Sequence, residues 1–189
     1  MYARLARVLF AVVIALPFTR AVADEYVDTI KVFRNAGESA KFFANSYGYA
    51  VFPTIGKGGF VVGGAHGSGR VYAKGKYVGD TSMTQVTVGL QLGGQAYSQV
   101  IFFKNRGAFD EFTSGSFEFG AQATAVAITA GASAQAGTSG ASAGASGSPK
   151  HATTAAKYYK GMAVFTVAKG GLMYEASIGG QKFSYKPRR

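Results

Sequence analysis

The chain has 189 residues, enough for one domain with a hydrophobic core, and its 20 Lys and Arg against 9 Asp and Glu give a formal net charge of +11. It has no cysteine, which excludes disulfides, thiolate metal sites, a cysteine nucleophile and a lipid-modified cysteine. Two histidines leave little material for a histidine-based metal site or catalytic triad. The excess of basic over acidic residues favours an anionic partner, such as phospholipid headgroups, nucleic acid or an acidic polymer.

Residues 1–23 are typical of a secretory signal peptide. Arg4 and Arg7 precede the apolar run VLFAVVIALPF, and the small residues of AVA predict cleavage before Asp24. An uncleaved anchor is the alternative. Removal of this segment, which holds three Arg and no acid, leaves 17 basic and 9 acidic residues, a formal +8. We therefore expect a periplasmic or secreted bacterial protein, for which nucleic acid is not a partner and any membrane association is peripheral and non-covalent.

Residues 24–45 predict one amphipathic helix or two short ones. Tyr26, Ile30 and Phe33 recur at spacings of four and three, and Gly37 would weaken the middle of a single helix. At about 100° per residue, three basic side chains fall together on one flank of the apolar face. They are Lys31, Arg34 and Lys41, with Val27 among them.

This basic flank has two interpretations. It is either a solvated side of a helix that packs on the domain, or a surface that binds lipid headgroups. In the second interpretation, exposed Val27, Phe42 or Phe43 would insert shallowly into the membrane.

From Tyr49 the pattern changes to strands. YAVFP and GFVVGGAHG flank a glycine-rich segment around Lys57, which predicts a hairpin turn. The related phrase MAVFTVAKGGLMYEA places Lys169 in a second such turn. The spacing does not match a Walker loop, since Lys57 is followed by glycine. Two interpretations of this segment remain open. The glycines only supply positive φ, or their N–H groups form a small nest that binds an anion beside the lysine.

The remaining elements complete the predicted fold. Residues 84–94 alternate as a strand that would bury Val86, Val88, Leu90 and Leu92, and Asn105 is placed to cap a short mid-chain helix. Residues 129–148 contain almost only Ala, Gly, Ser and Thr, which predicts a flexible loop. We expect an α+β fold, with N-terminal helical segments packed on antiparallel β-structure that closes as a sandwich or barrel.

Two carboxylates keep a hydrolase open as a further hypothesis. Glu118 and Glu175 lie within apolar strand patterns, where an acid is unusual. No serine sits in a nucleophile-elbow pattern, and a carboxylate in such a strand more often faces solvent or pairs with a lysine.

Four long phrases closely resemble the bacterial branch of the SYLF domain family. They are YAVFPTIGKGGFVVGGAHGSGRVY, TQVTVGLQLGGQAYSQVIFF, FTSGSFEFGAQATAVAITAGASA and GMAVFTVAKGGLMYEASIGGQKFSY. The resemblance runs from about Asp24 to Tyr185 and implies one lipid-binding domain over 24–189. It also implies membrane contact by the N-terminal amphipathic segment, and neither a catalytic activity nor a cofactor. The actin role of eukaryotic members should not transfer to a secreted bacterial protein.

The first hypothesis is therefore a non-enzymatic phospholipid-binding protein of the bacterial envelope. It would recognise anionic headgroups, phosphoinositide-like or other acidic phospholipids, without metal or cofactor. The candidate lipid-binding residues are Lys31, Arg34, Lys41, Lys57, Lys169, Val27, Phe42 and Phe43. The alternative is an envelope structural or protein-interaction module, with envelope proteins as partners and incidental lipid binding.

Overall fold

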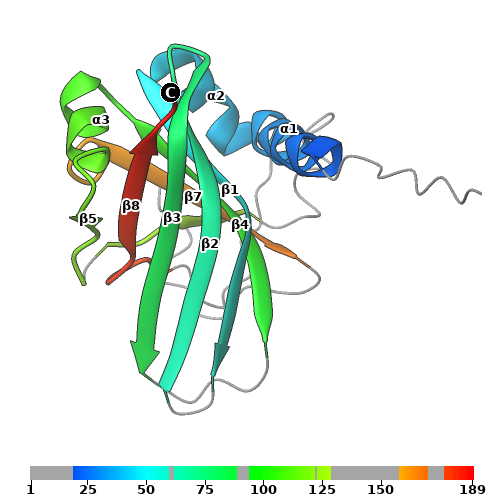
Figure 1. Ribbon diagram of the computed structural model, residues 1–189, viewed down its shortest axis with the longest axis vertical. Coiled ribbons are helices and arrows are strands. Elements are labelled where there is room, and N and C mark those ends of the chain that lie inside the picture. Colours follow the sequence, from blue (N-terminus) through cyan, green and yellow to red (C-terminus); the bar gives the residue numbers. More distant parts are fainter. Residues whose placement is uncertain (1–18, 60–61, 89–93, 122, 129–157, 170–176) are drawn as a thin grey trace, which may run out of the picture.

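The computed structural model describes residues 19–59, 62–88, 94–121, 123–128, 158–169 and 177–189 (Figure 1). They form an α+β fold, as predicted, with three helices and eight strands among the described residues. In chain order these elements are α1 (Thr19–Asn35), α2 (Gly37–Asn45), β1 (Gly48–Gly59), β2 (Val62–Ala73), β3 (Lys76–Val88), β4 (Gln95–Phe103), α3 (Arg106–Phe112), β5 (Phe117–Glu118), β6 (Val126–Ile128), β7 (Met162–Lys169) and β8 (Lys182–Pro187).

The strands form one curled sheet in the order β5-β8-β3-β2-β1-β4-β7-β6, a half-barrel. Neighbouring strands are antiparallel, as predicted, except that β6 runs parallel to β7. Strands β1 to β4 are long and form the centre of the sheet (Figure 1).

Both faces of the sheet carry an apolar cluster. On the inner face, which the curl encloses, Phe52, Ile101 and Phe183 belong to a cluster that Phe112 of α3 joins. On the outer face, Val51 and Phe165 belong to a second cluster, against which α1 and α2 pack. Because side chains alternate along a strand, β1 contributes Phe52 to the inner cluster and Val51 to the outer one.

The N-terminal segment is two helices rather than one. The break lies at Ala36, whose φ of −82° and ψ of 118° are extended. Ser39, which is fully buried, donates a hydrogen bond of 2.6 Å to the carbonyl oxygen of Phe33. The last turn of α1 is therefore tied to α2, and the helical projection that grouped Lys31 and Arg34 with Lys41 does not continue across the break.

A β-bulge at Pro53 and Thr54 interrupts β1. The register of β1 with both of its neighbours shifts just before Ile55. The extra residue lets Phe52 and Ile55, three positions apart, both point into the inner cluster. Proline suits this place, because it has no N–H to donate to the sheet.

The neighbouring strand β2 makes room for the bulged strand with glycines. A Cβ built on Gly67 would lie 2.6 Å from the side chain of Ile55, and one on Gly69 would lie 2.6 Å from the ring of Phe52. Only glycine at these two positions leaves the inner cluster undisturbed.

The predicted hairpin of β1 and β2 is confirmed, but the position of its turn at Lys57 is wrong, because β1 continues through the glycines to Gly59. Lys57 pairs with Ala65 of β2 and with Gln95 of β4, in the interior of the sheet. Glycine permits a turn but does not require one, and within the segment from 56 to 59 only Gly59 has a positive φ.

The predicted buried face of 84–94 is also wrong where the structure describes it. Val86 is 75% exposed, whereas Gln85 is buried and donates a hydrogen bond of 2.9 Å to the carbonyl oxygen of Gly179. The side chain of Val88, the stretch 89–93 and the predicted loop at 129–148 lie outside the described residues.

The mid-chain helix is confirmed. Asn105 caps α3, because its side-chain oxygen accepts a hydrogen bond of 3.0 Å from the backbone N–H of Ala108. Phe112 of this helix is fully buried in the inner cluster.

We expect Gly69→Ala to lower the free energy of unfolding by about 1–3 kcal/mol, the usual effect of an overpacked core. Gly58→Ala is the matched control, since a Cβ there meets nothing within 4 Å. It should be neutral or slightly stabilising. Urea unfolding of the two variants measures the difference, and equal losses would show that the Phe52 contact does not constrain β2.

Candidate functional site

The outer side of α1 combines exposed apolar and basic side chains. Val27 is 49% exposed and Val32 is 38% exposed, and both Lys31 and Arg34 are exposed. Val27, Lys31 and Arg34 are four and three residues apart, so they share one side of the helix. Lys31 forms an exposed ion pair with Asp28 at 3.2 Å.

Arg34 is held by an aromatic ring of α2. Its guanidinium lies 4.5 Å from the ring centroid of Phe43, which packs edge-on against Phe102. This cation–π contact positions the guanidinium of Arg34, and the residue stays exposed. Lys41, also exposed, belongs to α2.

Phe42 is not available for insertion into a membrane. It is only 7% exposed and packs against Phe102 and Phe165 with ring centroids 5.5 and 5.1 Å apart. Phe43 is half-buried. Of the apolar residues proposed from the sequence, the structure therefore leaves Val27 as the one with an exposed side chain.

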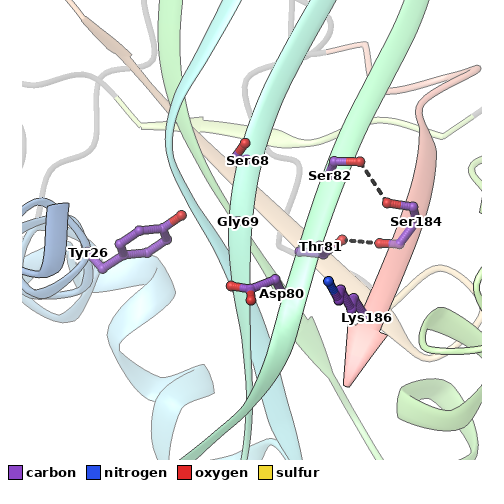
Figure 2. Close-up of a pocket in the computed structure, with 8 residues that line it drawn as sticks. All are labelled: Tyr26, Ser68, Gly69, Asp80, Thr81, Ser82, Ser184 and Lys186. Atoms are coloured by element: carbon purple, nitrogen blue, oxygen red, sulfur yellow. Dashed lines mark hydrogen bonds between the residues drawn. The ribbon is translucent and has the colours of Figure 1, made fainter. Parts of the chain in front are cut away.

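Tyr26, on the buried side of α1, helps to form a pocket that the sequence did not indicate. The pocket has a volume of about 350 Å³ and lies over the outer face of β2, β3 and β8 (Figure 2). Its lining side chains include Tyr26, Ser68, Asp80, Ser82, Ser184 and Lys186. No sequence motif joins these residues, because only the pairing of three strands brings them together.

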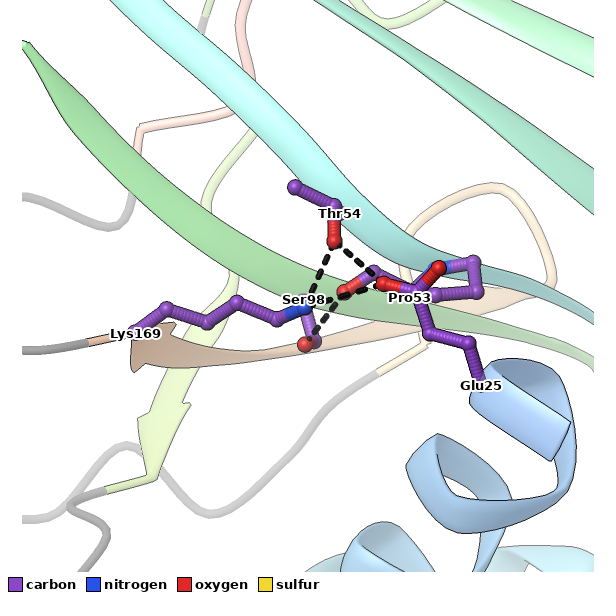
Figure 3. A network of polar contacts seen from close by, with 5 residues as sticks. All are labelled: Glu25, Pro53, Thr54, Ser98 and Lys169. Atoms are coloured by element: carbon purple, nitrogen blue, oxygen red, sulfur yellow. Dashed lines mark hydrogen bonds and ion pairs between the residues drawn. The ribbon is translucent and has the colours of Figure 1, made fainter. Parts of the chain in front are cut away.

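Lys169 is bound in a polar network that fastens α1 to the sheet (Figure 3). Its Nζ lies 3.2 Å from Glu25 Oε1 and donates a hydrogen bond of 2.5 Å to the hydroxyl of Thr54. That hydroxyl in turn donates to Glu25 Oε1 at 2.7 Å. Beside them, Ser98 donates a hydrogen bond of 2.7 Å to the carbonyl oxygen of Pro53.

The network shifts the titration of Glu25. The hydrogen bond from Thr54 is the largest cause that lowers the pKa of Glu25, and together with smaller contributions from Lys169 it outweighs the opposing effect of partial burial. Lys169 is thus a structural partner of a helix rather than a free cation.

Lys57 and Lys169 lie on opposite faces of the sheet. Lys57 pairs with Gln95 of β4, whereas Lys169 pairs with the next residue, Ala96. Paired residues share a face and consecutive residues alternate, so the two lysines point to opposite sides. Lys169 points to the outer face with α1, and Lys57 points to the inner face. They do not form one basic surface.

Glu118, one of the two acids that suggested hydrolysis, is exposed and pairs with Lys182 at 3.5 Å. Glu175 lies outside the described residues. Within the part of the chain that the structure describes, no group of three or more His, Asp or Glu could hold a metal ion. No helix in that part is long and apolar enough to span a membrane.

We expect acid to weaken the attachment of α1 through Glu25. A carboxyl whose pKa is lowered by folding stabilises the fold above its ordinary pKa of 4.5, and this stabilisation is lost as the pH falls through the folded-state pKa. Glu25→Gln should therefore show a smaller loss of stability between pH 7 and pH 3 than the unmodified protein.

Thermal unfolding at the two pH values measures this difference, and Glu111→Gln, on the exposed side of α3, is the control for loss of one acid. In a double-mutant cycle with Lys169→Gln, the coupling energy should be about 0.2–1 kcal/mol, because the pair is partly exposed. Identical pH dependence of Glu25→Gln and the control would contradict the role of this network.

Comparison with known proteins places the chain in a family. Residues 84–187 match the model of the family Ysc84, described as Las17-binding protein actin regulator. The chain is 29% identical over 168 residues to beta cell expansion factor A of Aeromonas veronii. The matched region covers 87% of this chain and 56% of that protein. The chain thus spans about half the length of this curated relative. Because the family model covers more than half of the chain, and the sequence phrases match the same family, the protein belongs to the Ysc84 (SYLF) family.

Proposed function

We propose that the protein is a non-enzymatic component of the bacterial envelope that binds anionic phospholipid surfaces through the outer side of α1. The observation that carries this proposal is that exposed Val27 lies on one side of α1 with exposed Lys31 and Arg34. Membership of a family associated with lipid binding and the predicted signal peptide, residues 1–23, support it. The match to the family model begins at residue 84 and does not include α1.

Two energetic contributions act at this surface. Each Lys or Arg near a charged membrane contributes about 1 kcal/mol, through attraction that salt screens. Lys31 exchanges Asp28 for a lipid phosphate, and Arg34 presents its planar guanidinium to phosphate oxygens. Lys41 adds a third charge from α2. Val27, which shares the side of Lys31 and Arg34, inserts shallowly, so its contribution depends little on salt.

We expect the triple charge reversal of Lys31, Arg34 and Lys41 to Glu to reduce binding to anionic vesicles at least 100-fold, from roughly 3 kcal/mol of lost attraction. Sedimentation with vesicles of phosphatidylglycerol in phosphatidylcholine, and with phosphatidylcholine alone, at two salt concentrations measures this. Binding of the unmodified protein should require the anionic lipid and decrease with salt.

A second triple reversal, at Lys74, Lys76 and Lys104, is the matched control. These lysines are exposed and their reversal changes the net charge by the same amount. Equal losses in the two triple variants would mean that binding follows net charge alone, and the proposal for α1 would fail.

Val27→Ser and Phe42→Ser should separate insertion from packing. Val27→Ser should weaken vesicle binding at high and low salt alike and leave the unfolding temperature unchanged, because Val27 is exposed. Phe42→Ser should lower stability by about 3–5 kcal/mol, the usual loss for a large buried aromatic side chain. Vesicle sedimentation and thermal unfolding of both variants test this, and a destabilised Val27→Ser would argue that the valine packs rather than inserts.

A protein-interaction module is the second candidate. Val62 and Val86 are 64% and 75% exposed, and both lie on the outer face, because Val86 pairs with Gly64, two residues after Val62. Two exposed valines on neighbouring strands favour a protein contact. Partners from envelope extracts that survive detergent and are lost in Val86→Ser would support this candidate.

A further inference from the structure

Two polar rows cross the outer face of β2, β3 and β8. The pairing of these strands sets one serine of each side by side: Ser68, Ser82 and Ser184. The neighbouring row, two residues along each strand, consists of three charged residues: Arg70, Asp80 and Lys186. The β8 member of each row is more than 100 residues from the β2 and β3 members, and together the rows present hydroxyl donors beside charges.

The serine row forms the floor of the pocket in Figure 2. Ser68 and Ser184 are exposed, and the hydroxyls of Ser82 and Ser184 lie 2.7 Å apart and hydrogen-bond to each other. The ring of Tyr26 forms one wall, and Lys186 lies on the side of β8 (Figure 2). The pocket is therefore a concave site with a hydroxyl floor, an aromatic wall and a cation.

The charged row has an excess of positive charge. Asp80 accepts a hydrogen bond of 2.6 Å from the hydroxyl of Tyr77. Arg70 stacks over the rings of Tyr26 and Tyr77, at 4.2 and 5.1 Å. Among the described residues, neither Arg70 nor Lys186 forms an ion pair within 4.0 Å. Asp80 thus lies between Arg70 and Lys186, and the row keeps one positive charge in excess.

Lys182, on the same strand and face, shows the contrast. It pairs with Glu118 at 3.5 Å and does not line the pocket. Lys186, in the charged row, therefore differs from Lys182 because it forms no ion pair within 4.0 Å among the described residues, although Asp80 is its neighbour on β3.

We infer that this pocket binds a phosphate group carried by a polyol. The serine hydroxyls donate hydrogen bonds to phosphate oxygens, and the ammonium of Lys186 supplies the opposite charge. Asp80 accepts hydrogen bonds from the polyol hydroxyls, which a pocket for phosphate alone would not require. Tyr26 borders the carbon skeleton of the ligand.

This site is separate from the outer side of α1, and the inference stands whether or not that side binds membranes. The same chemistry occurs in a free polyol phosphate and in the headgroup of a glycerophospholipid. Soluble ligands and vesicles distinguish these two sources.

The test titrates the full chain with glycerol 3-phosphate, inorganic phosphate and glycerol, followed by isothermal titration calorimetry. Glycerol 3-phosphate should bind, phosphate more weakly, and glycerol not at all. Lys186→Gln should weaken glycerol 3-phosphate binding at least tenfold, and Lys182→Gln should leave it unchanged. Asp80→Asn should reduce the preference for glycerol 3-phosphate over phosphate.

Equal effects of Lys186→Gln and Lys182→Gln, or no binding of glycerol 3-phosphate, would overturn the inference. Unfolding temperatures of both variants exclude loss of folding as the cause. Vesicles of phosphatidylglycerol and of phosphatidylserine then identify the source. A preference for phosphatidylglycerol that Lys186→Gln removes supports a lipid headgroup, whereas retained binding of the soluble ligand without such a preference supports a free polyol phosphate.

Discussion

The bulge at Pro53 and Thr54 sets which face of the sheet each residue of β1 from Ile55 onward points to. Without the extra residue, Ile55 would point to the outer face and the alternation of β1 would be reversed from there to Gly59. With it, Phe52 and Ile55 both enter the inner cluster, and Thr54 is displaced toward α1. One irregularity in a central strand therefore fixes the core on one face and the helix attachment on the other.

Other parts of the chain fit this irregularity. Gly67 and Gly69 of β2 leave space for the side chains of Ile55 and Phe52. Ser98 of β4 donates to the carbonyl oxygen of Pro53, so this carbonyl has a buried partner. Because the bulge reverses the alternation, Lys57 points inward, away from α1. The phrase around Lys57 is thus a signature of strand packing rather than of a phosphate loop.

Sequence patterns predicted the elements whose signal is local. The structure confirms the cap of α3 at Asn105, and it decides between the two interpretations of residues 24–45 in favour of two helices. Neighbouring residues do not determine which face of a strand is buried when a bulge interrupts the strand or when a buried amide takes the place of an apolar residue. Gln85 is buried because it finds the carbonyl of Gly179, a partner 94 residues away, and Val86 is exposed as a result. The pocket escaped prediction for the same reason, since strand pairing assembles it.

Three consecutive residues of α1 connect the sheet, the pocket and the outer side of the helix. Glu25 reaches Thr54 and Lys169, Tyr26 stacks with Arg70 and borders the pocket, and Val27 points to solvent. Successive residues of a helix are rotated by about 100°, so two fixed directions determine the third. The exposure of Val27 is therefore a consequence of how Glu25 and Tyr26 are held, and not a defect of packing. A surface oriented by two buried or bonded neighbours is presented to a partner at a defined angle. This rigid placement distinguishes the outer side of α1 from an apolar residue that is exposed by chance.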